Sequence, residues 1–379
     1  MEPAPPVSTN RTSAAPLVGL ACLALVLYAA SERSLSPVHA EAYKKKLEAV
    51  RLMQDGEAAV LSAKRRKGVS IDRKNDPEGY GVIGPQFTLI TTDRGSQTAK
   101  SLAAHPNFAA AVTQMMLLAG VERGDLVAVG MTGSLPGLNL AVLSACKVIG
   151  ADPLVITSVG SSMFGANDPE LTWLDMESAL VDRAILPYRS LAASLGGGGD
   201  VGRGLSPAGR QLILDAIARN GVKLLEVDNA LEAVKQRMTL YDAAAASRGR
   251  RIRLYVNVGG GVASLGGAPN ARLIPAGLSR RLTERNYPNR GVLNVFAERG
   301  VPVLHLLEVE KLARELGITD ASPGTVRPGQ GLLFIKYTYN LWIVGASALL
   351  VLLANTLVLR LDIRKRMLRW SRSERIAHS

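Results

Sequence analysis

Two long apolar runs, one near each end of the chain, stand out from a mixed pattern of hydrophobic and polar positions. The runs at 12–31 and 340–359 contain no charged residue. With a rise of about 1.5 Å per residue, a helix of this length is suited to the roughly 30 Å hydrocarbon core of a bilayer. The pattern therefore predicts a transmembrane helix at each position, with residues 1–11 as an N-terminal tail.

The first apolar run could also be a cleaved signal peptide. Its last residues, 27–30 (LYAA), offer no good pair of small residues at the cleavage positions, and only Arg11 supplies charge before the run. An uncleaved anchor is therefore favoured.

Basic residues after the second run set the expected orientation. Arginine and lysine outnumber acidic residues in the tail 360–379, and such an excess stays on the cytoplasmic side. The segment between the two spans then lies outside the cytoplasm. Arg33 and residues 44–46 (KKK) follow the first span and favour the inverted topology, but the bias of the tail is larger and closer to its span.

The pattern between the spans changes from helical spacing to alternating strands and helices. Residues 38–63 carry apolar residues at helical spacing and 67–84 are rich in turn formers, which predicts an amphipathic stalk and linker over 38–84. Continuous apolar runs separated by helices over 85–335 favour an α/β domain with an open, doubly wound, mostly parallel sheet. The expected strands are 126–130, 154–159, 223–227, 252–258 and 301–306, and the expected helices are 106–118, 136–149, 168–181, 207–219, one ending near 246 and one after 306.

Composition narrows the classes of partner. The 379 residues carry a formal net charge of +13, and the basic clusters at 64–67 and 248–253 lie in the segment between the spans, which should attract polyanions. Nucleic acid is not the expected partner, because aromatic residues make up only 4% of the chain and no nucleic-acid-binding fold is recognisable. Cys22 and Cys146 are the only cysteines, so no disulfide framework is expected.

Glycine-rich loops follow two of the expected strands. Thr132, Gly133 and Ser134 lie between a strand and a helix, where backbone N–H groups and the helix dipole favour an anion, although an ordinary capped turn has equal weight. The second loop contains three consecutive glycines, which permit close approach of a ligand and favour binding over mere flexibility. Its predicted ligand-binding residues are Asn257, Gly259, Gly260, Gly261 and Ser264.

The loop after the second strand and a third glycine-rich loop are further candidates. Ser158, Ser161, Asn167 and Asp168 follow the second strand, where ligands bind in doubly wound folds, although Asp168 could simply cap the next helix. The loop 195–204 (LGGGGDVGRG) is either a mobile flap or a plain surface loop.

Signatures of catalysis are weak. Ser144 and Lys147 match S-x-x-K, but they fall in the middle of a predicted helix, and no G-x-S-x-G is present. His105 and His305 have no cluster of metal ligands or nucleophiles around them in the sequence. No metal site is predicted, and the catalytic residues and any cofactor stay unassigned.

Several short motifs together resemble a known family. They are 90–100 (ITTDRGSQTAK), 106–109, Gly133 and Ser134 with Pro136 and Asn139, 158–161, 165–168, 172–177 and 256–260. The chain from about 88 to 265 is similar to the poly-gamma-glutamate system protein family, a membrane component encoded with bacterial poly-gamma-glutamate synthesis machinery. Residues 93–94 and 198–199 are local departures from the resemblance.

The resemblance implies a protein of the bacterial cytoplasmic (inner) membrane that takes part in making, exporting or anchoring an anionic polymer. Its partners would be poly-gamma-glutamate or another polyanion, other membrane components of the system, and the lipid bilayer. The resemblance is compatible with three roles. The first is an accessory component that binds the polymer or a partner subunit. The second is a hydrolase or transferase using Ser134, Ser161 or Thr132 near Asp168, and the third is a structural scaffold of the synthase.

Overall fold

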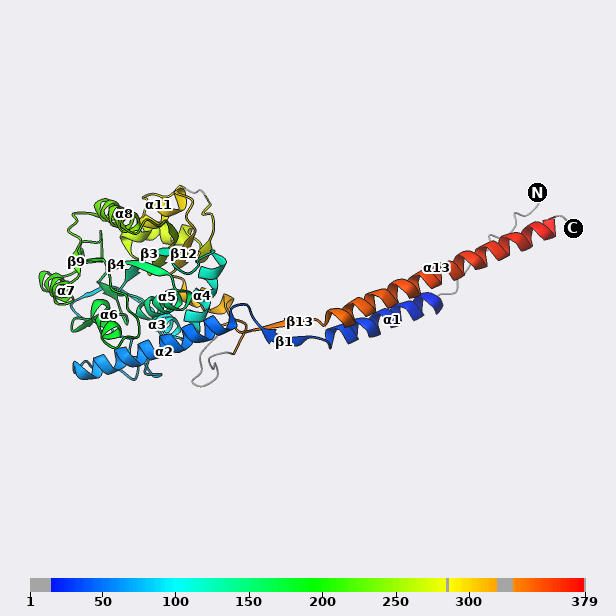
Figure 1. The fold of residues 1–379 in the computed structure, drawn as a ribbon, viewed down its shortest axis with the longest axis horizontal. Helices are drawn as coiled ribbons and strands as arrows, with labels where there is room; N and C mark the ends of the chain where they lie inside the picture. Colours follow the sequence, from blue (N-terminus) through cyan, green and yellow to red (C-terminus); the bar gives the residue numbers. More distant parts are fainter. Residues whose placement is uncertain (1–14, 284–285, 319–329, 378–379) are drawn as a thin grey trace, which may run out of the picture. The chain divides into compact units, whose positions relative to one another are not determined.

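The computed structural model describes residues 15–283, 286–318 and 330–377, and its chain divides into two units (Figure 1). One unit contains the described residues up to His39 and from Ile335 onward, and the other contains the described part of Ala40–Phe334. The predicted tail 1–11 and the first three residues of the predicted span 12–31 lie outside the described residues.

The unit formed by the two ends of the chain is a helical hairpin with a short strand pair. Helices α1 (Ala15–Glu32) and α13 (Leu341–Ala377) pack along each other, and β1 (Ser36–His39) pairs antiparallel with β13 (Ile335–Thr338). Two stretches, Ala15–Glu32 and Leu341–Leu361, are long and apolar enough to cross a membrane by length and composition. Helix α13 continues beyond its apolar part into the basic tail predicted from residue 360.

The other unit is built on a seven-stranded, mostly parallel sheet, so the α/β class predicted from the sequence is confirmed. Strands β3 (Leu126–Thr132), β4 (Asp152–Ser158) and β10 (Ile252–Val258) form its centre and are almost wholly buried, which explains their continuous apolar sequences. The order is β11-β12-β10-β3-β4-β8-β9. The outer strands are β12 (Val303–Leu306), β8 (Ala192–Ser194), β9 (Lys223–Leu224) and the antiparallel β11 (Gly277–Ser279).

Helices pack on both sides of this sheet. Helix α5 (Pro136–Ile149) contacts β3 and β4, whereas α8 (Ala230–Ser247) and α11 (Val292–Glu298) lie on the side of these strands away from α5 (Figure 1). Apolar side chains of β3 and β4 share a core with the stacked rings of Tyr255 and Phe296. The other elements are α3 (Gln97–Ala103), α4 (Asn107–Leu118), α6 (Trp173–Asp182), α7 (Pro207–Arg219), α9 (Val262–Leu265), α10 (Ala268–Leu273), α12 (Val309–Glu315), and the strand pairs β2 (Thr91–Asp93) with β5 (Ser161–Ser162) and β6 (Asn167–Asp168) with β7 (Leu171–Thr172).

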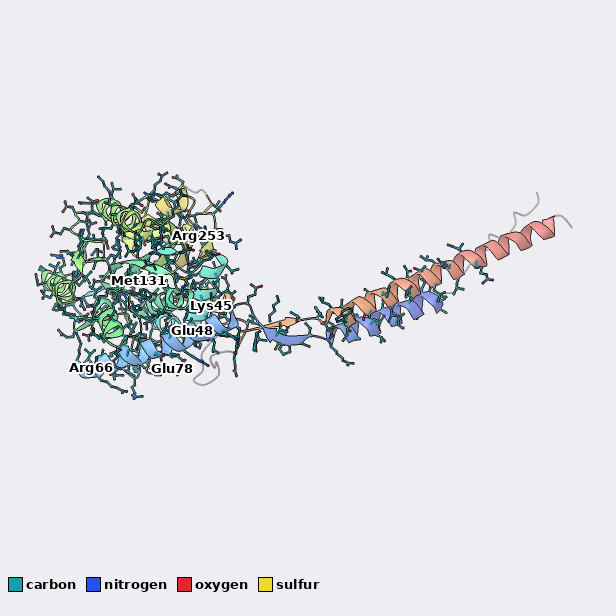
Figure 2. The ribbon with its side chains drawn as sticks, viewed as in Figure 1. Lys45, Glu48, Arg66, Glu78, Met131 and Arg253 are labelled. Atoms are coloured by element: carbon teal, nitrogen blue, oxygen red, sulfur yellow. The ribbon has the colours of Figure 1, made fainter. Side chains whose placement is uncertain are left out.

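The helix predicted as part of a stalk is instead a component of the α/β unit. Helix α2 (Tyr43–Arg66) packs against α4, α5 and α6 and buries Val50 and Met53 completely. Lys45, Glu48 and Arg66 lie along its exposed side, and Met131 of β3 lies inside the unit (Figure 2). The amphipathic pattern of 38–63 therefore marks a stripe that faces the core.

The helix predicted to begin at Asp168 starts five residues later. Residues 167–172 form the β6–β7 hairpin, and the N-cap of α6 is Thr172. The Thr172 N–H and hydroxyl both donate to Asp175 Oδ2, at 2.8 and 2.7 Å. The Asp-Pro pair at 168–169 is thus a turn signal here, and Asp168 does not cap a helix.

Candidate functional site

Loops that follow the central strands meet in one cleft of about 590 Å³. Thr132 at the end of β3 pairs with Ser158 at the end of β4, and Gly130 of β3 pairs with Asn257 of β10, so the carboxyl ends of all three strands share one edge. The chain runs outward from β3 to β9 and then returns to β10 on the other side of β3. The cleft therefore lies where the strand order reverses, the usual ligand position in open parallel sheets.

Half of the predicted binding residues line this cleft: Thr132, Ser134, Ser158, Gly259, Gly260 and Gly261. Lining residues that sequence reasoning did not select come chiefly from 92–100, from 160–162 and from the loop 196–203. The glycine loops predicted at the strand ends thus lie together, and a segment between β2 and α3 completes the walls.

Hydrogen bonds between hydroxyl groups and backbone fix these loops to one another. The Thr132 hydroxyl donates to the Val258 carbonyl at 3.2 Å and accepts from the Ser134 N–H at 3.3 Å. The Ser162 N–H in turn donates to Ser134 Oγ at 3.0 Å. These hydrogen bonds connect the end of β10, the loop after β3, and β5. The residues that line the cleft are therefore held in place by contacts within the protein.

The three consecutive glycines have different structural reasons. Gly259 adopts a φ of +90°, and a Cβ there would lie 2.3 Å from Thr132 Oγ1. Its lack of a side chain lets the loops after β3 and β10 pack together. Gly260 has ordinary φ, and a Cβ there would meet only Leu307 Cδ1, at 3.9 Å. The absence of a side chain at Gly260 therefore leaves free space in the cleft. At Gly259 it allows close packing against Thr132 at the base of the cleft.

Alanine substitutions separate these two roles. Gly259→Ala should lower the free energy of unfolding by about 1–3 kcal/mol, because it imposes a positive φ on alanine and forces Thr132 aside. Gly260→Ala is the matched control and should change stability by less than about 0.5 kcal/mol. Guanidinium unfolding of the full-length variants in detergent, followed through the buried Trp173, measures both values. Equal stabilities for the two variants would contradict the packing role of Gly259.

A buried ion pair anchors the loop 196–204, which the sequence left as a flap or a surface loop. Arg237 Nη2 of α8 donates to Asp200 Oδ2 at 2.8 Å, and both side chains are at most 3% exposed. The same nitrogen donates to the hydroxyls of Ser158 and Ser194, at 3.0 and 2.8 Å. Ser158 also donates to Asp200 Oδ1 at 2.7 Å. The loop is therefore fixed to β4, β8 and α8, and Ser158 supports it rather than standing free.

The predicted residues Gly133 and Ser161 lie behind the cleft wall. The Ser161 hydroxyl is fully buried and donates to the Gly133 carbonyl at 3.0 Å. A Cβ at Gly133 would lie 2.5 Å from the Val159 carbonyl oxygen. Both residues thus serve the close packing of the loops after β3 and β4.

Asn167 and Asp168 lie in the β6–β7 hairpin and do not line the cleft. Asn167 Nδ2 donates to the Pro85 carbonyl and to Thr91 Oγ1, at 2.9 and 3.0 Å. Asp168 Oδ1 accepts from the Glu170 N–H at 2.9 Å. Their polar atoms therefore fasten the segment before β2 and shape the hairpin turn.

Asn257 and Ser264 are buried beneath the second glycine loop. Asn257 Nδ2 donates to the Gly259 carbonyl at 2.8 Å and lies 2.9 Å from His305 Nδ1. Ser264 Oγ is hydrogen-bonded to the hydroxyl of Tyr255. Burial lowers the pKa of His305 to about 4, so this imidazole is neutral at pH 7 and belongs to the support of the loop.

Lys100 and Ser162 are the most informative residues that the sequence did not reveal. Lys100 of α3 is 5% exposed, and its Nζ donates to Ser162 Oγ at 2.8 Å and to the carbonyl of Ser134. Burial lowers the pKa of Lys100 to about 7. The two residues are 62 positions apart, so no local motif joins them.

The charges around the cleft favour an anionic ligand. Among the described lining residues, Arg94, Lys100 and Arg203 are basic, and Asp93 and Asp200 are acidic. Asp200 is already paired with Arg237, which leaves Asp93 as the acid that faces the three bases. Within the described residues, no group of three or more His, Cys, Asp or Glu side chains is placed to hold a metal ion.

Comparisons with protein-family models, with curated proteins and with solved structures give no match to this chain. The geometry and charge of the cleft are therefore what supports a function.

Proposed function

We propose that this chain is a membrane-anchored accessory component of poly-gamma-glutamate synthesis or export, whose α/β unit binds carboxylates of the polymer in the cleft. The polymer identity comes from the family resemblance of the motifs around 90–100, 158–168 and 256–260. The observation that carries the binding role is the meeting of Arg94 and Arg203 with the glycine loops at one sheet edge.

The cleft suits an extended chain that bears repeated carboxylates. Arg94 and Arg203 are exposed at its walls, where a guanidinium can form a bidentate pair with a carboxylate. Gly260 leaves room for backbone approach. A cleft beside a reversal of strand order is also the binding position of doubly wound sheets, and we assign the fold to that class.

The terminal hairpin supports anchoring at both ends. If both apolar stretches span a bilayer, their antiparallel packing supports a topology in which the segment before the first span and the segment after the second lie on the same side. The excess of basic residues in 360–379 assigns that side to the cytoplasm. The α/β unit then faces outward, where the exported polymer would meet it.

Removal of the two cleft arginines tests the binding role. The double variant Arg94→Ala/Arg203→Ala should weaken binding of fluorescent poly-gamma-glutamate to the full-length protein in detergent by about tenfold or more, because two charge-assisted contacts are lost. Wild-type affinity should fall as salt rises, since screening weakens exposed charge pairs. Fluorescence anisotropy measures both effects.

A charge-matched control uses arginines away from the cleft. Arg65→Ala/Arg251→Ala removes two exposed charges, at the end of α2 and just before β10, and should leave binding within about twofold, because only long-range attraction is lost. The orientation is tested with the same polymer, which should bind right-side-out membrane vesicles but not inverted ones. Equal losses in both double variants, or binding only to inverted vesicles, would refute the proposal.

A further inference from the structure

We propose that Ser162 is a nucleophile activated by Lys100, and that the cleft cleaves or transfers amide-linked acyl groups of the anionic ligand. The identity of the substrate rests on the proposed function, whereas the nucleophile and its base rest on the geometry of the two residues. Neither Ser144, which lies buried inside α5, nor the predicted candidates Thr132, Ser134 and Ser161 has this arrangement.

The distance between the two groups is that of a nucleophile and its base. Lys100 Nζ lies 2.8 Å from Ser162 Oγ, within the range for direct proton transfer. Ser162 lines the cleft and is partly exposed, so a ligand can reach its hydroxyl. The Ser134 carbonyl accepts a second hydrogen bond from Nζ and orients the amine. Nucleophile, base and orienting group are thus contiguous.

The backbone around the pair holds both side chains in place. Ser162 belongs to β5, which pairs with β2, and its N–H is occupied by Ser134 Oγ. A Cβ at Gly95 would lie 3.2 Å from Ser162 Oγ and 3.3 Å from Lys100 Cε. The chain at Gly95 therefore packs directly on the pair and keeps water from the lysine stem.

The environment of Lys100 favours an amine over an ammonium ion. Burial lowers its pKa to about 7, so a large fraction is neutral at physiological pH. A neutral amine has one lone pair for the Ser162 proton and an N–H for the Ser134 carbonyl. A lysine whose role was only to attract anions would bind them better as an exposed, fully charged ammonium ion.

The charged groups around Lys100 do not favour its protonated form. Arg94 and Arg203 line the same cleft and are positively charged, so they do not stabilise the ammonium form of Lys100. Asp93 lies next to Arg94, and Asp200 is paired with Arg237 of α8. From α12, Glu310 accepts a hydrogen bond from the Ser96 hydroxyl, at 3.2 Å.

The reaction balances with water or an amine as the final acceptor. Ser162 Oγ attacks an amide carbonyl while Lys100 takes the hydroxyl proton, and an oxyanion forms. The C–N bond breaks, Lys100 returns the proton to the departing amine, and an acyl ester remains on Ser162. Water then attacks the ester carbonyl and gives a proton to Lys100. The bond from the acyl carbon to Ser162 Oγ breaks, Lys100 returns the proton to that oxygen, and a carboxylic acid is released. Attack by an amine instead forms a new amide and regenerates Ser162 in the same way.

A fluorophosphonate tests the nucleophile independently of the polymer. In the full-length protein in detergent, the serine oxygen displaces fluoride from phosphorus, and peptide mass spectrometry should place the adduct on Ser162. Labelling should increase with pH around an apparent pKa near 7, as Lys100 loses its proton. The exposed Ser247 serves as the internal control and should stay unlabelled.

Variants at the two positions separate catalysis from structure. Ser162→Ala should abolish the adduct, and Lys100→Arg, whose guanidinium stays charged and cannot act as a base, should slow labelling at least 100-fold. Ser162→Cys should react with an iodoacetamide probe at residue 162, and peptide mass spectrometry separates this adduct from one on the exposed Cys22. No adduct on wild-type Ser162, or equal rates for wild type and Lys100→Arg, would overturn the pair.

Polymer chain length distinguishes this inference from the binding proposal. Incubation of the wild-type protein with poly-gamma-glutamate should shorten or cross-link the polymer on a gel, and Ser162→Ala should bind the polymer without changing its length. Polymer binding without any Ser162 adduct would refute the catalytic pair and leave the binding proposal intact. A Ser162 adduct without polymer binding would uphold the pair and refute poly-gamma-glutamate as the substrate.

Discussion

Arg237→Met should destabilise the α/β unit by about 3–5 kcal/mol, because removal of one partner leaves the carboxylate of Asp200 buried without its counter-charge. Asp200 is 2% exposed, and its backbone has a φ of +66°, so it cannot turn to solvent without opening the loop 196–204. Ser158 and Ser194 lose a donor in the same change. Denaturant unfolding of the full-length variant in detergent measures the loss.

A second substitution shows whether the charge is the cause. Asp200→Asn/Arg237→Met removes both charges, and asparagine is among the residues that tolerate a positive φ. The double variant should be more stable than Arg237→Met alone, since replacement of a buried ion pair by neutral groups is often nearly neutral. A loss below about 1 kcal/mol for Arg237→Met would mean that the pair does not anchor the loop.

Lys100→Met should change stability in a direction that depends on pH. The pKa of Lys100 is lowered from 10.5 to about 7 by burial, so between these values the folded protein binds fewer protons than the unfolded chain. Stability of the wild type therefore rises with pH across this window, by up to roughly 1.4 kcal/mol per unit. Below about pH 7 Lys100 is protonated in both states, so the full free-energy cost of burying the charged ammonium group lowers the stability of the folded protein.

The variant removes this pH dependence together with two hydrogen bonds. Near pH 7, Lys100→Met should be more stable than wild type by about 1–3 kcal/mol, since the relief of burial exceeds the roughly 1 kcal/mol lost for each bond. Near pH 10 the order should reverse. Unfolding curves of both proteins at about one-unit intervals give the difference, in which the other titrating groups cancel. A difference that is constant with pH would contradict a buried, titrating lysine.

Most of the sheet and its helices could be predicted from the sequence. Strands β3, β4 and β10 are buried along most of their length, so apolar residues dominate their sequences. Helix α5 begins at Pro136 and ends before Gly150, as its sequence signals predict. Strand β8 was missed because its three residues (AAS) are too short and too small to form a run. Strand β11 is a short antiparallel edge with equally little signal.

Half of the predicted binding residues line one cleft for a general reason. Parallel strands end at one edge, so residues at the ends of β3, β4 and β10 come together, as Thr132, Ser158 and Gly260 do. Lys100 and Ser162 were not predicted, because α3 and β5 have no strand or helix pattern strong enough to place them. Their contact depends on tertiary packing of segments far apart in the sequence.

The strand pair β1–β13 has a consequence for how the chain is assembled. His39 lies opposite Ile335, and the adjoining Ala40 N–H donates to the Phe334 carbonyl at 2.9 Å, so the first and last residues of the α/β unit are neighbours. In the sequence, residues 40–334 are thus an insertion between the two strands of one pair. The adjacent ends of the insertion are the arrangement that lets a domain be inserted into another chain, because a tight turn can join two antiparallel strands without the inserted residues.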